Sequence, residues 1–465
     1  MKFLLVNLPL DIYPANNRIE IYNTMPPYGL GYIASVSEVF LGKENVKLID
    51  AEYRGLSLEN INKEIVDYNP DIIGINVSSA NFFVFESLLN NISQKYLGKI
   101  IVGGPHAIIC PNDFFKIDKQ GFINFICLGE GEFVFKQFFE GYEKRNIENI
   151  CYKDVDGTIV SNPKKTIVDF NNIYIDRSVF QNDLIFKDGY KKSYMVTSRG
   201  CPNYCSFCAA PYIYGHNFFL RSKESLLKEL VHLKSLGVNH IRFIDDLFLC
   251  SNKRIQDFIS ILSELNLSKS NFSFEATGRV DILSQLDDNI WKLLSGYGLD
   301  ELEIGIESGS QRILNLMNKH ISINNIFTVI EKCLKYHVKI KCFIICGYYT
   351  ETVYDLEKTI ALCKSLKHFC KNLIRFSATP AKAYPGTLLF DQITSCGYIP
   401  SQEYMYIDLS QYSCEEKEKL DLLKARTRYN AVHKNSQLPL LLSEISGGAD
   451  SLSVIQALIE IALIS

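Results

Sequence analysis

The chain has 465 residues, 47% hydrophobic and 22% charged, and a formal net charge of −3 at pH 7. This length favours about two to four domains with substantial cores. The nearly neutral charge, without a run of lysine and arginine, argues against a nucleic-acid partner. No apolar stretch reaches the about 18 residues that a membrane span needs, and fourteen scattered cysteines lack the spacing of a secreted scaffold. We expect a cytoplasmic protein with neither a membrane nor a nucleic acid as partner.

Residues 1–145 alternate short apolar runs with longer amphipathic ones, which predicts a doubly wound parallel α/β sheet. The apolar start is too short for a signal peptide and favours a first buried strand. The expected strands are 2–8, 46–50, 71–77, 100–103 and 124–128, and the expected helices are 29–41, 58–68, 82–96 and 132–142. Ligands of such sheets bind at the carboxyl ends of the strands. Small and polar residues stand there: Ser78, Ser79, Gly103, Gly104, Pro105, His106, Gly129 and Glu130.

Residues 146–192 predict a hairpin, with Asp156-Gly157 at its turn, followed by a linker. From residue 193 the alternation of strands and helices begins again and continues to residue 399. The expected strands are 194–197, 240–244, 271–277, 301–306, 338–346 and 373–377. Six such units predict a partial (β/α) barrel with its chemistry at the carboxyl ends of the strands. Residues 400–465 have helical spacing over 410–424 and 440–464 and form a short C-terminal region.

Cys201, Cys205 and Cys208 follow the first strand of this barrel in Cys-x3-Cys-x2-Cys spacing. A structural zinc site usually takes four ligands, and no second Cys-x-x-Cys pair lies nearby. A 4Fe-4S cluster held by three thiolates keeps one iron open for a small molecule. The spacing therefore favours an iron-sulfur cluster over a zinc knuckle or a group of buried thiols.

This spacing, with an aromatic residue before the last cysteine, resembles the radical S-adenosylmethionine (SAM) superfamily. The resemblance implies that the open iron chelates SAM and that an electron from the cluster generates a 5'-deoxyadenosyl radical. It implies further contacts with SAM from residues at strand ends: Phe207, Arg221, Asp245, Asp246, Glu307, Ser308 and Gly347. A helix-start role for Arg221 and a polar strand end at Asp245 are the alternatives. The family's Gly-x-Pro-x-Glu-Thr segment has Tyr349 in place of proline here, which leaves that loop less restricted in φ.

Gly103-Gly104-Pro105-His106-Ala107, followed by Gly129-Glu130-Gly131-Glu132, resembles the cobalamin-binding domain fused to many radical SAM enzymes. None of the eight histidines follows an aspartate by two positions, so the Asp-x-His-x-x-Gly motif that supplies a cobalt ligand elsewhere is absent. We therefore expect no lower axial histidine, and we expect His106 to anchor a turn rather than to bind cobalt. A sheet that has lost its cofactor and serves as a docking platform is the alternative.

Together the two resemblances imply a cobalamin-dependent radical SAM methyltransferase acting on an unactivated carbon, or on phosphorus, of a small-molecule or peptide natural product. One SAM would generate the substrate radical, methylcobalamin would donate the methyl group, and a second SAM would restore it. An electron donor such as flavodoxin or ferredoxin is implied as partner. The alternatives are a cobalamin-dependent ring contraction or cyclisation without methyl transfer, and an electron-transfer or sensory protein whose cluster never cleaves SAM.

Overall fold

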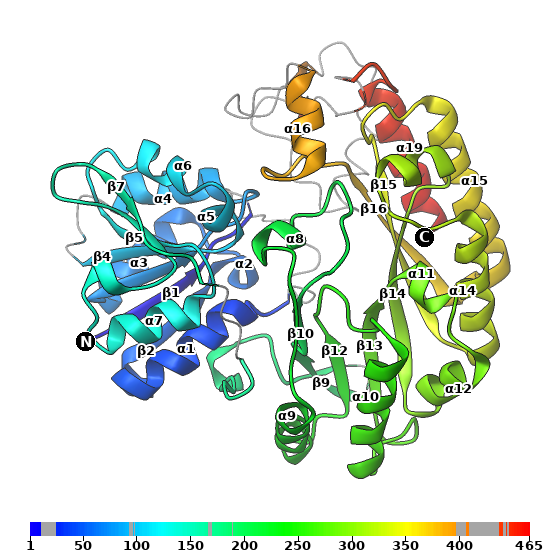
Figure 1. Ribbon diagram of the computed structural model, residues 1–465, viewed down its shortest axis with the longest axis horizontal. Helices are drawn as coiled ribbons and strands as arrows, with labels where there is room; N and C mark the ends of the chain where they lie inside the picture. Colours follow the sequence, from blue (N-terminus) through cyan, green and yellow to red (C-terminus); the bar gives the residue numbers. More distant parts are fainter. Residues whose placement is uncertain are drawn as a thin grey trace. The chain divides into compact units, whose positions relative to one another are not determined.

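The computed structural model describes residues 1–10, 25–92, 96, 98–165, 170–187, 189–396, 406–408, 437–439, 443 and 446–465. The chain divides into two compact units (Figure 1). The first comprises residues 1–192 with 213–215, and the second comprises residues 193–212 with 216–465. Each unit is described by itself.

The first unit is built on a seven-stranded sheet in the order β2-β1-β3-β4-β5-β6-β7. Five parallel strands form its body: β1 (Phe3–Asn7), β2 (Val46–Asp50), β3 (Ile72–Asn76), β4 (Lys99–Gly103) and β5 (Ile123–Cys127). The predicted hairpin, β6 (Ile150–Lys153) and β7 (Ile159–Ser161), extends the sheet, because β6 pairs antiparallel with β5. The hairpin thus belongs to the first sheet rather than to a free linker.

Helices cover both faces of this sheet, as predicted for a doubly wound fold. Along β1, Leu4 and Val6 belong to one hydrophobic core while Phe3 and Leu5 belong to the other, the period of two that a strand buried on both faces imposes. The first core takes residues from α3 (Leu58–Tyr68), α4 (Phe82–Ile92), α5 (Pro105–Ile109) and α6 (Pro111–Ile117). The second takes residues from α1 (Tyr28–Leu41) and α7 (Gly131–Phe139).

Shorter elements complete the first unit: α2 (Ala51–Arg54), η2 (Lys43–Asn45), η3 (Lys144–Asn146) and η4 (Arg177–Val179). The strand β8 (Ile185–Lys187), near the end of this part of the chain, belongs to the second sheet. The segment predicted as a linker is held against α1. Asp183 lies fully buried, its Oδ2 3.1 Å from Arg177 Nη1, and it accepts a hydrogen bond of 2.8 Å from the Tyr28 hydroxyl. The buried charge is paired and hydrogen-bonded, as burial requires.

The second unit is an open half-barrel whose strands follow the order β16-β15-β14-β13-β12-β9-β8. Its strands are β9 (Tyr190–Met195), β12 (His240–Phe243), β13 (Ser273–Gly278), β14 (Leu299–Glu307), β15 (Lys339–Cys346) and β16 (Ile374–Pro380). The sequential order and the parallel pairing of β12 to β16 confirm the predicted partial barrel. β8 adds an antiparallel edge strand to β9.

Helices alternate with the strands of the second unit. The helices labelled α12, α14 and α15 run along one side of the curved sheet (Figure 1). The longer ones are α9 (Lys223–Ser235), α10 (Asn252–Glu264), α12 (Asp288–Gly296), α14 (Ile323–Tyr336), α15 (Val353–Cys370), α16 (Leu388–Ser395) and α19 (Ser451–Ile464). The shorter elements are α8 (Ala210–Ile213), α11 (Val280–Leu283), α13 (Gln311–Leu316), η5 (Lys371–Leu373), and the antiparallel pairs β10 (Ser198–Gly200) with β11 (Phe218–Leu220) and β17 (Tyr406–Asp408) with β18 (Gln437–Pro439).

The C-terminal prediction is met in part. α19 confirms a helix at the end of the chain, whereas the helix expected over 410–424 lies outside the described residues. Within the described ranges, no helix combines the length and the apolar character needed to cross a membrane. The cysteines of those ranges are all free thiols.

Candidate active site

The cysteine loop begins directly after β10. Cys205 is buried at 8% exposure, and Cys201 and Cys208 are partly exposed. Asn203 Nδ2 donates to Cys201 Sγ at 3.2 Å, and Arg279 Nη1 donates to Cys205 Sγ at 3.3 Å. Donors aimed at sulfur stabilise the thiolate, which is the form that binds metal. Two of the three sulfurs therefore have surroundings suited to ligation.

The spacing of the three sulfurs distinguishes between a single ion and a cluster. Ligands of one ion lie close together, whereas the sulfurs of these three described cysteines do not all lie within 4.8 Å of one another. A 4Fe-4S cube binds each thiolate through a different iron and so holds them further apart. The loop fits a cluster better than it fits a single zinc ion.

Ser206 fixes the loop between its second and third cysteines. Its amide donates to Met317 O at 3.0 Å, and its carbonyl accepts from Leu389 N at 2.9 Å. Its hydroxyl lies 2.6 Å from the Tyr348 hydroxyl and donates to Leu316 O at 3.1 Å. Three separate segments of the second unit thus hold this one residue, which orients the flanking cysteines.

A buried pair of opposite charges stands beside the loop. Lys319 Nζ donates to Glu307 Oε1 at 2.7 Å, and the two residues are 8% and 5% exposed. Burial alone would lower the pKa of Lys319, but the Glu307 carboxylate and the Cys205 thiol outweigh it, and this pKa is raised. The Lys319 ammonium also lies 5.7 Å from the Phe207 ring centre. The lysine is therefore charged, between the aromatic residue of the loop and a carboxylate.

The backbone at the end of β14 is shaped to admit this pair. Glu307 has φ +56°, in the left-handed region that glutamate seldom adopts, and the register with β15 shifts between Gly305 and Glu307. A Cβ on Gly305 would lie 2.0 Å from Glu307 Oε1 and 2.6 Å from Lys319 Nζ. Only glycine leaves room there for both charged groups. Strain of this kind concentrates at functional sites.

Asp245 and Arg221 were predicted to contact SAM, and the structure gives both of them protein partners. Asp245 accepts from the amides of Thr197 at 2.6 Å and Ser198 at 3.1 Å, and burial raises its pKa to about 6. Arg221 is buried in an ion pair with Glu229 and donates to Val196 O at 3.1 Å. These contacts fix the strand that leads into the cysteine loop. Both side chains therefore support the backbone that precedes the cysteine loop.

Asp246, the next residue along, is exposed rather than buried. Its negative charge acts on Cys208, whose pKa is raised to about 12 chiefly by burial. Of the two adjacent aspartates, Asp246 is thus the one whose carboxylate reaches the neighbourhood of the cysteines.

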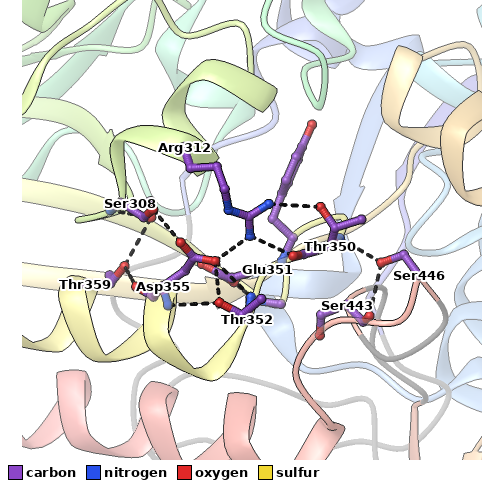
Figure 2. A network of polar contacts seen from close by, with 12 residues as sticks. Ser308, Arg312, Thr350, Glu351, Thr352, Asp355, Thr359, Ser443 and Ser446 are labelled. Carbon is purple, nitrogen blue, oxygen red and sulfur yellow. Dashed lines mark hydrogen bonds and ion pairs between the residues drawn. The ribbon is translucent and has the colours of Figure 1, made fainter.

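The loop after β15 carries Gly347 and is fixed by a network of polar contacts (Figure 2). Glu351 Oε2 accepts from the amides of Gly347 at 2.5 Å and Tyr348 at 3.1 Å. Arg312 donates to Thr350 O at 2.7 Å and forms an ion pair with Asp355. This network replaces the proline of the related motif as the source of rigidity in the loop.

Glu351 is fully buried, and its Oε1 has no hydrogen-bond partner among the described residues. Burial raises its pKa to about 8. Ser308, the other predicted residue of this region, places its hydroxyl 3.1 Å from Thr359 Oγ1 on α15. Ser308 thus joins the end of β14 to α15 within the same network.

The C-terminal segment completes this loop (Figure 2). Ser446 Oγ accepts from Thr350 N at 2.8 Å, and Ser443 N donates to Gly347 O at 3.1 Å. Ala449 N donates to Glu351 O at 2.6 Å. The end of the chain therefore contributes backbone contacts to a loop about 100 residues earlier, which the sequence did not indicate.

In the first unit, the predicted polar residues gather at the carboxyl edge of the sheet, after β3, β4 and β5. Ser78 N and Oγ both contact Asn81 Oδ1, at 2.7 and 3.1 Å. Gly104 has φ +99°, and a Cβ there would lie 2.4 Å from Asn76 Oδ1. Only glycine allows this crossing from β4 into α5.

The other predicted residues occupy the same edge. Pro105 is the first residue of α5, and His106 N donates to Val77 O at 3.1 Å, which anchors the turn as expected. Gly103 ends β4 with room for closer approach, since a Cβ there would meet only Cys127, at 3.5 Å. Gly129 and Glu130 lead into α7, with Glu130 as its N-terminal flanking residue. The edge combines an open backbone with short polar side chains, which fits a large ligand such as cobalamin.

Two family models match the chain, one in each unit. The Radical SAM superfamily model matches residues 195–363, and the B12 binding domain model matches residues 17–139. This chain combines a B12-binding domain with a radical SAM domain. The cysteine loop, the Lys319–Glu307 pair and the Gly347 loop all lie in the radical SAM domain, and the glycine-rich edge after β4 lies in the B12-binding domain.

Similar proteins align with this chain over most of their length. An uncharacterised methyltransferase of Pyrococcus horikoshii is 28% identical over 401 residues, covering 84% of this chain and 83% of its own. The cytidylyl-2-hydroxyethylphosphonate methyltransferase of Streptomyces wedmorensis is 21% identical and covers 87% and 84%. The radical SAM methyltransferase TsrM from Kitasatospora setae, solved with cobalamin and a [4Fe-4S] cluster, superposes with a TM-score of 0.63 at 14% identity, over 87% of this chain and 77% of that one.

Three residues of the radical SAM domain were missed from the sequence: Arg279, Lys319 and Tyr348. Arg279 follows β13 directly, so it had the same signal, a charged residue at a strand end, that indicated Asp245. Lys319 lies twelve positions after Glu307, beyond a short helix, and no local pattern connects the two. Tyr348 follows Gly347 directly, and its position in the sequence did not indicate a contact with the cysteine loop.

Proposed function

We propose that this chain is a cobalamin-dependent radical SAM methyltransferase acting on a small-molecule or peptide substrate at an unactivated carbon or at phosphorus. The observation that carries the proposal is the Lys319–Glu307 pair beside Cys205. Methyltransferases that align over more than four fifths of the chain support the reaction type. When bound, the cluster supplies the electron that cleaves SAM, and cobalamin carries the methyl group.

The chain's own residues would divide the binding of SAM between two charges. The methionyl group of SAM carries an ammonium and a carboxylate, and the Glu307–Lys319 pair offers one partner of each sign. Charge-assisted hydrogen bonds of this kind are about twice as strong as neutral ones. Phe207, whose ring lies near Lys319, would bound the same space. Because the pair is buried, water competes little for either charge.

The residues around the loop would hold the cluster ligands in place. Cys201, Cys205 and Cys208 would bind three irons, with Arg279 and Asn203 donating to two of the sulfurs. Hydrogen bonds to cluster sulfurs raise the reduction potential, so Arg279 also tunes the electron transfer. A low-potential donor of the flavodoxin or ferredoxin type would supply the electron. The free thiols of the described residues suit a reducing, cytoplasmic setting.

The test is a product analysis of the reconstituted holoprotein under anaerobic reduction, with and without cobalamin. The proposal predicts S-adenosylhomocysteine that depends on cobalamin, together with 5'-deoxyadenosine, both measured by mass spectrometry. 5'-Deoxyadenosine without cobalamin-dependent S-adenosylhomocysteine would favour ring contraction or cyclisation. Neither product would favour an electron-transfer or sensory protein. Cys205→Ala is the matched control, because it removes one cluster ligand and should abolish both products.

A further inference from the structure

A second group of metal-ligating side chains lies in the B12-binding domain, where α5 meets α6. His106, Cys110 and Asp113 bring an imidazole nitrogen, a thiol sulfur and a carboxylate oxygen within 4.8 Å of one another. His106 lies in α5 and Asp113 in α6. Cys110 joins those helices, and its amide donates to His106 O at 2.7 Å.

The imidazole of His106 is oriented for ligation. Its Nδ1 lies 2.9 Å from Ser79 Oγ. In the tautomer whose Nδ1–H donates to this hydroxyl, Nε2 presents its lone pair toward Cys110 and Asp113. Metal-binding histidines almost always have such a partner on the other ring nitrogen. Ser79 is therefore placed to set the tautomer that binds a metal.

Within the part of the chain that the structure describes, the Nε2 atom of His106 has no hydrogen-bond partner, although the residue is only 6% exposed. The nearest carboxylate oxygen, Asp113 Oδ2, lies 3.6 Å away, beyond hydrogen-bond distance. A buried polar atom left unpaired costs about 1 to 3 kcal/mol, so native proteins seldom leave one without a purpose. A cation between these atoms would satisfy both the nitrogen and the oxygen.

The surroundings hold the three ligands in place. The His106 ring packs against Phe82 and Phe114, with centroid distances of 4.4 and 5.6 Å. Lys116 Nζ donates to Asp113 Oδ1 at 2.8 Å, which leaves Oδ2 directed at the histidine. The imidazole thus has one orientation, and the carboxylate has one oxygen committed and one available.

We propose that His106, Cys110 and Asp113 bind a divalent metal ion of the zinc class, with its fourth position open to water or a small ligand. Nitrogen, sulfur and oxygen ligands together suit Zn²⁺ and exclude the all-oxygen cations Mg²⁺ and Ca²⁺. Binding displaces the proton of the Cys110 thiol to solvent, so one proton is released per metal. The site is separate from the cluster cysteines, and the proposal does not depend on the methyltransferase function.

The experiment uses the full chain with Cys201, Cys205 and Cys208 replaced by alanine, so that the cluster loop cannot compete for metal. After chelation and dialysis, Zn²⁺ is titrated against a chromogenic chelator. We expect one Zn²⁺ per chain, with affinity reduced at least about 100-fold by His106→Gln or Cys110→Ser, and about 10- to 100-fold by Ser79→Ala. His232→Gln and Cys396→Ser, which remove an exposed imidazole and an exposed thiol, should leave it unchanged.

A second readout uses the unaltered, cluster-loaded protein and does not rely on any variant folding. Zn²⁺ should protect Cys110 from alkylation, measured by peptide mass spectrometry, whereas Cys396 should react at the same rate with and without Zn²⁺. Zinc binding that survives both His106→Gln and Cys110→Ser would overturn the proposal. So would Cys110 alkylation at an unchanged rate in the presence of excess Zn²⁺.

Discussion

The hydroxyls of Tyr348 and Ser206 lie 2.6 Å apart and join the loop after β15 to the centre of the cysteine loop. Tyr348 is fully buried, and Ser206 is 2% exposed. Both hydroxyls also lie near the Leu316 carbonyl oxygen, Ser206 Oγ at 3.1 Å and the Tyr348 hydroxyl at 3.4 Å. A side chain of the loop after β15 thereby fixes the position of Ser206, which stands between Cys205 and Cys208.

Tyr348→Phe should weaken this connection without creating a cavity. The loss of one buried hydrogen bond costs about 0.5 to 1.5 kcal/mol. We expect the reconstituted variant to lose its cluster several times faster than the wild type under a chelator, measured by the decay of visible absorbance and by iron content. Tyr349→Phe is the matched control, since among the described residues it is Tyr348, and not Tyr349, whose hydroxyl contacts Ser206. Equal decay rates for Tyr348→Phe and Tyr349→Phe would contradict the bracing role.

Lys319→Gln should raise the dissociation constant for SAM while leaving the cluster intact. Loss of a hydrogen bond to a charged group costs about 1.5 to 3 kcal/mol, which corresponds to about 10- to 150-fold in affinity. Calorimetric titration of the reconstituted protein with SAM measures the change, and iron content checks the cluster.

Two further variants separate binding from folding in this test. Lys319→Arg keeps the charge and should recover most of the affinity, which a purely structural loss would not do. Lys341→Gln removes a lysine that pairs with Glu303 on the same sheet, and it should bind SAM as the wild type does. If Lys319→Gln binds SAM with wild-type affinity, the assignment of Lys319 as a contact of SAM is wrong.

Local signals explain which elements the sequence predicted well. α3 was expected over 58–68 and occupies those residues, because Ser57 caps its start by accepting from Asn60 N and Asn69 ends it in the left-handed conformation. α5 and α6 were missed because each has fewer than eight residues, too few for a helical period to be visible. Pro105 and Pro111, as first residues of these helices, were the available signal.

The directions of side chains in the folded protein explain which features of the site could not be predicted from the sequence. Asp245 was placed correctly at a strand end, but its carboxylate turns back to the amides of Thr197 and Ser198. The sequence pattern of a strand predicts which residue follows the strand, but it does not predict the direction of that residue's side chain. Lys319, which meets Glu307, lies between Asn318 and His320, both with positive φ. Asparagine and histidine are enriched in this conformation, but only a small fraction of them adopts it, so the sequence did not predict it here.

The packing of α19 predicts a contrast between two nearby apolar residues. Ile461 is fully buried, whereas Leu463 is 56% exposed. Ile461→Ala should lower the free energy of unfolding by about 2 to 5 kcal/mol through lost burial and a cavity. Leu463→Ala should change it by less than about 0.5 kcal/mol. Urea denaturation followed by circular dichroism measures both, and similar values would show that α19 does not pack as described.

Glu351 predicts a specific pH dependence of stability. Its pKa is about 8 in the folded protein, where burial is the main cause, against an ordinary value of 4.5. Between these two values the folded state binds a proton that the unfolded state does not, so stability falls as pH rises through this window. Glu351→Gln removes the titration and should flatten this dependence.

The measurement compares urea unfolding of the wild type and Glu351→Gln at pH 5.5 and pH 8. The free-energy difference between the two proteins should shift by a few kcal/mol in favour of the variant at the higher pH, since one pKa unit corresponds to about 1.4 kcal/mol. Glu357 on α15, the helix that follows this loop, is exposed, and Glu357→Gln should follow the wild type. An ionised carboxylate accepts hydrogen bonds more strongly than the neutral acid, so the contacts of Glu351 with the amides of Gly347 and Tyr348 persist at the higher pH, and the loss of stability comes from burying the charge. Equal pH dependence of the unfolding free energy in the wild type and in Glu351→Gln would contradict this assignment.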